Sequence, residues 1–143
     1  MKAKKILMAE DDPQDIELAL IALAEYNLAN EVVVTTDGEE TLDYLFRRGK
    51  FADRPDKNPI VIFLDLKMPK ISGLEVLQRV KSDPNLRTIP VVVMTSSEED
   101  QDIVQSYTSG VNAYVVKPIA FDRFIDVVKQ LGLFWVLTNK PPK

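Results

Sequence analysis

The sequence predicts an α/β fold in which helices cover both faces of a parallel β-sheet. Short apolar runs alternate along the chain with longer segments of helical period. The runs are apolar throughout, which is typical of strands buried on both faces, and a strand, a helix and a further strand form a right-handed crossover in a parallel sheet. We therefore expect five strands and five helices in one compact domain, which suits a chain of 143 residues.

Five runs rich in β-branched residues are the expected strands. They are KKILMA (4–9), EVVVTT (31–36), IVIFLD (60–65), PVVVMT (90–95) and AYVVK (113–117). A flavodoxin-like (βα)5 three-layer sandwich with strand order 2-1-3-4-5 is the natural fit to five such strands, although periodicity alone does not fix the order.

The segments between the runs carry apolar residues at helical spacing. Four sets each share one helical face: Ile16, Leu20, Leu23 and Ala24; Leu42, Leu45 and Phe46; Leu74, Leu77 and Val80; Phe124, Ile125 and Val128. Helix starts are indicated by Asp12-Pro13, Asp37 and Ser72, and the ends of the second and fourth helices by Gly49 and Gly110. The long polar connection 47–59 is expected on the side of the sheet away from any ligand site.

Composition excludes several classes of chemistry. The chain has no cysteine and no histidine, which removes disulfides, thiolate sites and the commonest general base. A net charge of -4 without a basic run argues against nucleic acid as a main partner. No apolar stretch is long enough to span a membrane, and the start lacks a signal-peptide cleavage site, so we expect a cytoplasmic protein.

Polar residues follow four of the expected strands. They are Glu10, Asp11 and Asp12 after the first, Asp65 at the end of the third, Thr95 and Ser96 after the fourth, and Lys117 at the end of the fifth. If the first and third strands are neighbours about 5 Å apart, their carboxylates converge and repel one another unless a cation lies between them. Carboxylates and carbonyls suit a hard ion such as Mg²⁺, with Lys117 and Thr95 placed to contact a phosphoryl group.

Each of these residues taken alone also has an ordinary structural explanation. Asp65 could be a turn residue or a helix cap, and the acids at 10–12 could complement the dipole of the next helix. Thr95 could likewise belong to a capping segment, and Lys117 could be a surface lysine at a turn. Their joint placement at the strand ends favours a common site.

The pieces ILMAEDD, FLDLKMPKISGLEVL, VVVMTSS and AYVVKP occur in that order, and with them the sequence resembles the receiver domain of two-component response regulators. The resemblance covers about residues 4–131. It implies that Asp65 accepts a phosphoryl group from a phosphohistidine of a partner histidine kinase. It further implies that Asp11 and Asp65 bind Mg²⁺ directly, with Glu10 acting through water and Lys67 through its backbone carbonyl. Glu10 stands where the family more often has Asp.

The resemblance also assigns roles around the acceptor. Lys117 would pair with the phosphoryl group, Thr95 would donate its hydroxyl to it, and Tyr114 would be the aromatic switch. Met68-Pro69 and Gly73 would shape the loop after Asp65. Phosphorylation would then change the face formed by 103–107, 114–116 and 121–128, in a protein that catalyses only its own aspartyl phosphorylation and dephosphorylation.

A narrower resemblance is to stand-alone regulators that pair with bacterial phytochrome kinases. It depends on the long loop after LDYLFRRG, the phrase DLKMPK, and a chain that ends soon after the aromatic LFW. It implies a receiver domain at 1–133, a short extension at 134–143 without an output domain, and a homodimer through the fourth helix, the fifth strand and the fifth helix. Phe134 and Trp135 would either cover the partner subunit or pack on their own core.

Other functions stay open at this point. The protein could be a phosphorelay intermediate or a phosphate sink. A haloacid-dehalogenase-like phosphatase also uses a strand-end Asp with Mg²⁺, but it needs a second Asp at the position of Lys67. A flavodoxin-like FMN carrier shares the fold, but the acids of EDDPQD would repel phosphate.

Overall fold

The computed structural model describes residues 5–28, 31–55, 57–96, 111–117 and 119–132. They contain one five-stranded parallel sheet with the order β2-β1-β3-β4-β5. The strands are β1 (Ile6–Ala9), β2 (Val32–Thr35), β3 (Val61–Asp65), β4 (Val91–Thr95) and β5 (Val111–Val116). The helices are α1 (Pro13–Ala24), α2 (Gly38–Phe46), the short 3-10 helix η2 (Gly49–Phe51), α3 (Gly73–Ser82) and α5 (Phe121–Gln130). The predicted fold class and strand order are confirmed, while the predicted fourth helix and Gly110 lie outside the described residues.

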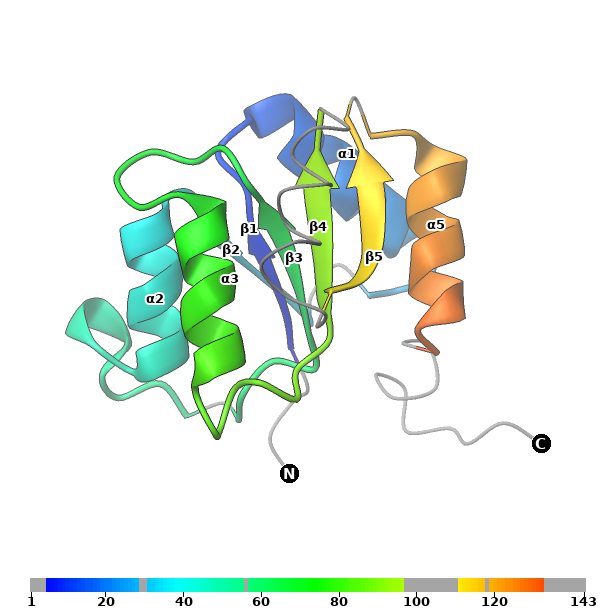
Figure 1. The fold of residues 1–143 in the computed structure, drawn as a ribbon. Coiled ribbons are helices and arrows are strands. Elements are labelled where there is room, and N and C mark those ends of the chain that lie inside the picture. The colour runs from blue at the N-terminus through cyan, green and yellow to red at the C-terminus, as the bar shows by residue number, and fades with distance from the viewer. Residues whose placement is uncertain (1–4, 29–30, 56, 97–110, 118, 133–143) are drawn as a thin grey trace.

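Two hydrophobic cores make the fold a three-layer sandwich (Figure 1). The sheet sends alternate side chains to opposite faces, so that Ile6 and Met8 pack with α1 and α5, whereas Leu7 and Ala9 pack with α2 and α3. Phe63 of β3 and Phe124 of α5 are fully buried, with ring centroids 5.0 Å apart. Burial on both faces explains why the strands are continuously apolar.

Three predicted helix starts are confirmed by capping hydrogen bonds. Asp12 accepts from the Gln14 N–H at 2.9 Å, and Pro13 is the first residue of α1. Asp37 accepts from the Glu40 N–H at 2.7 Å, and Ser72 accepts from the Glu75 N–H at 3.3 Å. These caps fix the first turns of helices that begin at the carboxyl ends of the strands.

One sequence expectation about a helix end is wrong, and the packing of α1 adds a detail that the sequence did not give. The second helix ends at Phe46, and its cap is Arg47 in the left-handed conformation, so Gly49 does not close it but begins η2. Of the four apolar residues that share one face of α1, only Leu23 is fully buried, whereas Ile16 and Leu20 are half-buried and Ala24 is exposed. The residues of α1 that are buried are Ala19, Ala22 and Leu23, because small side chains allow α1 to approach the sheet and α5 closely.

The long connection 47–59 lies at the end of the sheet where β3 begins, as expected from its place before that strand. Arg54 anchors it. Its guanidinium lies 4.3 Å from the ring centroid of Tyr44 and donates to the Tyr44 carbonyl at 2.8 Å and to the Lys57 carbonyl at 3.0 Å. None of the described helices is long and apolar enough to cross a membrane.

Candidate functional site

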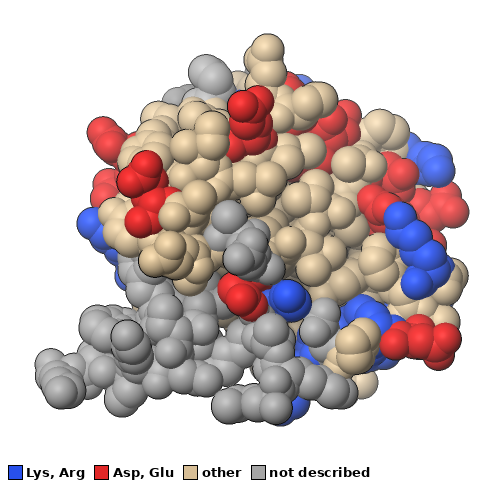
Figure 2. Space-filling view, turned by 180° about the vertical axis from the view of Figure 1, so that it is seen from behind, with Lys and Arg blue, Asp and Glu red and all other residues tan. Residues whose placement is uncertain are grey.

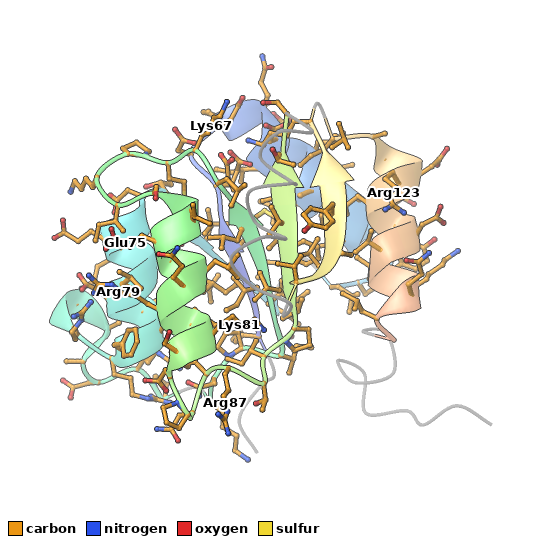
Figure 3. All side chains as sticks on the ribbon, in the orientation of Figure 1. Lys67, Glu75, Arg79, Lys81, Arg87 and Arg123 are labelled. Atoms are coloured by element: carbon orange, nitrogen blue, oxygen red, sulfur yellow. The ribbon has the colours of Figure 1, made fainter. Side chains whose placement is uncertain are left out.

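A polar pocket of about 200 Å³ opens at the carboxyl ends of the strands. It is lined by Asp11, Asp12, Asp65, Leu66, Lys67, Thr95, Ser96 and Lys117. The pocket therefore collects the predicted residues from the ends of four strands except Glu10, which is fully buried. Figure 3 shows Lys67 at this end of the sheet, whereas Lys81 and Arg87 lie at the opposite end.

Three carboxylates meet in or beside this pocket because β1 and β3 are neighbours in the sheet. Ala9 pairs with Leu64 in register, so the residues that follow, Glu10 and Asp65, lie side by side. One oxygen each of Glu10, Asp11 and Asp65 lies within 4.8 Å of the others. Glu10 is fully buried and Asp65 is 3% exposed, whereas Asp11 faces solvent. Such an oxygen cluster, partly open to water, fits a hard divalent cation.

Lys117, directly after β5, extends over the carboxylates. Its Nζ lies 2.8 Å and 2.9 Å from the two Glu10 oxygens and 3.0 Å from Asp65 Oδ2. A third carboxylate, Asp15 of α1, lies 3.2 Å from the same Nζ. Asp15 was not predicted from the sequence, although its place in the first turn of the helix that follows Asp11 and Asp12 could have indicated that it lies at the same end of the molecule.

Burial changes the proton affinity of these groups. Desolvation raises the pKa of Glu10 to about 7, even though the hydrogen bonds from Lys117 and from the Asp12 N–H favour its charged form. Burial alone would lower the pKa of Lys117, but its hydrogen bonds to Glu10 and Asp65 raise the pKa overall. Lys117 is therefore a permanent cation in the pocket, whereas Glu10 exchanges its proton near neutral pH.

The sequence profile described as "Response regulator receiver domain" matches residues 6–129, which include all five strands and every residue of the pocket. This chain belongs to the response regulator receiver domain family. The family assignment confirms the resemblance drawn from the four sequence pieces. It also leaves the phosphatase and the FMN carrier without support.

This receiver domain is similar to regulators associated with phytochromes. It is 55% identical to the bacteriophytochrome response regulator RtBRR, with a TM-score of 0.85 over 98% of this chain and 84% of RtBRR. The structure of the phosphorylated cyanobacterial phytochrome response regulator RcpA is 41% identical, with a TM-score of 0.77 over 95% of this chain and 96% of RcpA.

The response regulator Rcp1 of Synechocystis sp. is a third relative. It is 34% identical over 139 residues, which cover 97% of this chain and 93% of Rcp1. The structure of the Mn²⁺-bound form of Rcp1 has a TM-score of 0.76 and 33% identity over 98% of this chain and 99% of Rcp1. The narrower resemblance to phytochrome-associated regulators is thus confirmed.

The loop after Asp65 is held in place at its base. The Lys67 N–H donates to Asp65 Oδ1 at 3.1 Å, and the Gly73 N–H donates to the Leu66 carbonyl at 2.9 Å. A Cβ added at Gly73 would lie 2.0 Å from the Asp65 carbonyl oxygen, so only glycine allows this approach. Met68 is nearly buried and packs into the core beside α3.

Two further predicted residues lie on the adjacent strands. Thr95 ends β4, is 2% exposed and lines the pocket, and its backbone carbonyl accepts from the Lys117 N–H at 2.8 Å. Tyr114 lies on β5, paired in register with Val93, and it is half-buried against the core shared with α2 and α3. Tyr114 does not line the pocket, so its predicted switch role would require a movement. Of the predicted signalling face, the part at 103–107 lies outside the described residues.

Proposed function

We propose that this receiver domain is a response regulator that accepts a phosphoryl group on Asp65 from the phosphohistidine of a partner histidine kinase. The observation that supports it most directly is the shared pocket of Asp65, two further carboxylates and Lys117. The relatives named above make a phytochrome-type kinase the partner that we propose.

The contacts of Asp65 suit it to act as a nucleophile. Lys117 holds Oδ2 and the Lys67 N–H holds Oδ1, so the carboxylate has a fixed direction. An oxygen of Asp65 forms a bond to phosphorus while the bond between phosphorus and the kinase histidine breaks, and the imidazole leaves. Lys117 and the Thr95 hydroxyl then stabilise the negative charge of the phosphoryl oxygens.

Glu10, Asp11 and Asp65 are proposed to hold Mg²⁺, with the Lys67 carbonyl as a further ligand. The cluster fits such an ion because its ligand atoms are oxygens, because they lie close together, and because one member faces water. When bound, the ion neutralises charge on the phosphoryl oxygens. The Mn²⁺-bound form of Rcp1 supports a divalent cation in a related receiver domain.

An apolar surface on α1 supports a protein as the phosphoryl donor. A shallow groove of about 500 Å³ is lined by Pro13, Ile16, Glu17, Leu20, Ile21 and Ala24, and Ile21 is 50% exposed. Figure 2, the view from behind, shows uncharged residues across the middle of this side, with acidic and basic residues toward its edges. The groove adjoins the pocket because Pro13 follows Asp12, so we propose that the helical histidine domain of the kinase docks here.

The output proposed here is a change on the face that includes β5 and α5. A doubly charged phosphoryl group beside Thr95 and Lys117 would favour one of two arrangements, with Tyr114 as the switch. Val116 is 55% exposed and Phe121 is 38% exposed, and such side chains suit a homodimer contact. The proposed contribution of Phe134 and Trp135 lies outside the described residues.

Intact-mass spectrometry after incubation with Mg²⁺ and acetyl phosphate tests the acceptor. The unaltered chain should gain one phosphoryl group, whereas Asp65→Asn should gain none. Asp53→Asn removes the same charge from an exposed position in the long loop and serves as the matched control. Equal labelling of Asp65→Asn and the unaltered chain would show that another residue is the acceptor.

A second experiment tests the proposed docking surface on α1 by comparing phosphoryl transfer from a kinase with labelling by acetyl phosphate. Ile21→Lys should lower phosphoryl transfer from a phytochrome kinase at least about tenfold, because it places a charge in the apolar contact, while labelling by acetyl phosphate stays unchanged. Ala52→Lys adds the same charge at the far end of the molecule and should transfer normally. Unimpaired transfer from the kinase to Ile21→Lys would rule out this surface.

A further inference from the structure

We propose that Asp15 is a positioning residue that keeps the Lys117 ammonium over Asp65 when a divalent cation occupies the carboxylate cluster. The proposal builds on the proposed function, because it concerns the same acceptor and the same lysine. It assigns a role to a carboxylate that no motif in the sequence singled out.

The three acidic residues that contact Lys117 within the described part of the chain are not equivalent. Glu10 and Asp65 belong to the group whose oxygens lie within 4.8 Å of one another, and Asp15 does not. Asp15 Oδ2 nevertheless lies 3.2 Å from Lys117 Nζ, nearly as close as Asp65 Oδ2 at 3.0 Å. Asp15 is therefore the partner of Lys117 that lies outside the predicted cation site.

A bound cation changes the balance of charge around Lys117. The negative charge of Glu10 and Asp65 would then be shared with an ion that repels the ammonium group. Lys117 is joined to the backbone by a flexible four-carbon chain, so without another partner its ammonium would gain rotational freedom by turning toward solvent. Asp15 opposes this movement, because its carboxylate lies 3.2 Å from Lys117 Nζ and does not belong to the cluster that would hold the ion.

Local structure makes Asp15 suited to this task. It lies in the first turn of α1, near the positive end of the helix dipole, where acidic residues are common. The Asp15 side chain is 13% exposed and that of Lys117 is 16% exposed, so water and salt screen the pair less than a surface ion pair. The neighbouring Asp12 has a different contact, because it caps α1 by accepting from the Gln14 N–H.

Three variants separate this role from a general effect of charge. Asp15→Asn keeps the shape of the side chain but removes its charge, and Asp15→Glu restores the carboxylate on a longer arm. Asp122→Asn is the matched control, because Asp122 is an exposed first-turn acid of α5, the helix that packs beside α1. Urea unfolding and far-ultraviolet circular dichroism establish that each variant is folded.

The first measurement does not depend on phosphoryl transfer. Lysine acetylation by an N-hydroxysuccinimide ester, followed by peptide mass spectrometry, reports how fast the Lys117 amine reacts with and without saturating Mg²⁺. In Mg²⁺ the acetylation rate at Lys117 should be about fivefold higher in Asp15→Asn than in the wild type. In Asp15→Glu it should return most of the way to the wild-type rate, and in Asp122→Asn it should stay at that rate. An unchanged Lys117 rate in Asp15→Asn overturns the proposal.

The second measurement is steady-state phosphorylation by acetyl phosphate at saturating Mg²⁺. Asp15→Asn should lower kcat about fivefold with little change in the Mg²⁺ requirement, and Asp15→Glu should recover most of the loss. The proposal is overturned if Asp15→Asn is phosphorylated faster than the unaltered chain, or if additional Mg²⁺ restores the lost kcat. If the unaltered chain is never labelled, the proposed function fails, and the acetylation rates still decide whether Asp15 holds Lys117.

Discussion

In the absence of divalent ions, this receiver domain should lose stability as the pH rises from about 5 to about 8, because Glu10 must ionise while buried. The folded pKa of Glu10 is about 7, above its ordinary value of 4.5. The folded state therefore binds this proton more tightly than the unfolded state between these two pH values. The stabilisation by protonation is complete below the ordinary value and is lost as the pH passes through the folded value.

The size of the effect follows from the pKa difference. One pKa unit corresponds to about 1.4 kcal/mol, so the change from 4.5 to about 7 limits the loss to about 3 kcal/mol. The main cause is desolvation, which the contact with Lys117 offsets only in part. The glutamine side chain in Glu10→Gln cannot ionise, so the free energy of unfolding of this variant should not show this loss as the pH rises.

Urea unfolding in a chelating buffer at several pH values between 5 and 8 measures the effect. Other carboxylates titrate in both proteins, so the informative quantity is the difference between the unaltered chain and Glu10→Gln. This difference should change by about 2–3 kcal/mol in favour of Glu10→Gln as the pH rises. Parallel pH profiles for the two proteins would show that the burial of Glu10 does not control its ionisation.

Three further predictions concern the framework of the site. Gly73→Ala should cost more than about 3 kcal/mol of unfolding free energy, because the new Cβ would lie 2.0 Å from the Asp65 carbonyl oxygen, and a loss below about 1 kcal/mol in urea would contradict this close approach. Phe124→Ala should cost about 3–5 kcal/mol, since its fully buried ring fills the core between the sheet and α5, and an unchanged urea midpoint would contradict that packing. Arg54→Lys should increase proteolysis within 52–58, because lysine cannot both stack on Tyr44 and donate to the carbonyls, while an unchanged cleavage rate would show that Arg54 does not anchor the loop.

The sequence predicted most of the framework because its signals are local. Continuous β-branched runs gave the five strands to within about two residues at each end, and side-chain caps such as Asp37 marked the helix starts. Helix ends were less certain. Arg47 adopts the left-handed conformation that Gly49 had been expected to supply, and this conformation lets the Arg48 N–H donate to the Asp43 carbonyl at 2.8 Å.

Pattern alone could not decide which face of α1 is buried. Two apolar stripes run along this helix, one with larger side chains such as Ile16 and Leu20 and one with Ala19 and Ala22. The alanine-rich stripe is the one that packs, since close approach to α5 and the sheet requires small side chains. The larger residues remain on the surface that we propose as the docking site.

By itself the sequence determined the class of fold and the types of side chain at the strand ends, because both depend on residues close together in the chain. Tertiary structure decided which of those side chains meet. Strand order places Lys117 against Glu10, 107 residues earlier, and the position of α1 adds Asp15 to the same ammonium group. Contacts of this kind arise from crossover connections and helix packing, whose geometry no local pattern specifies.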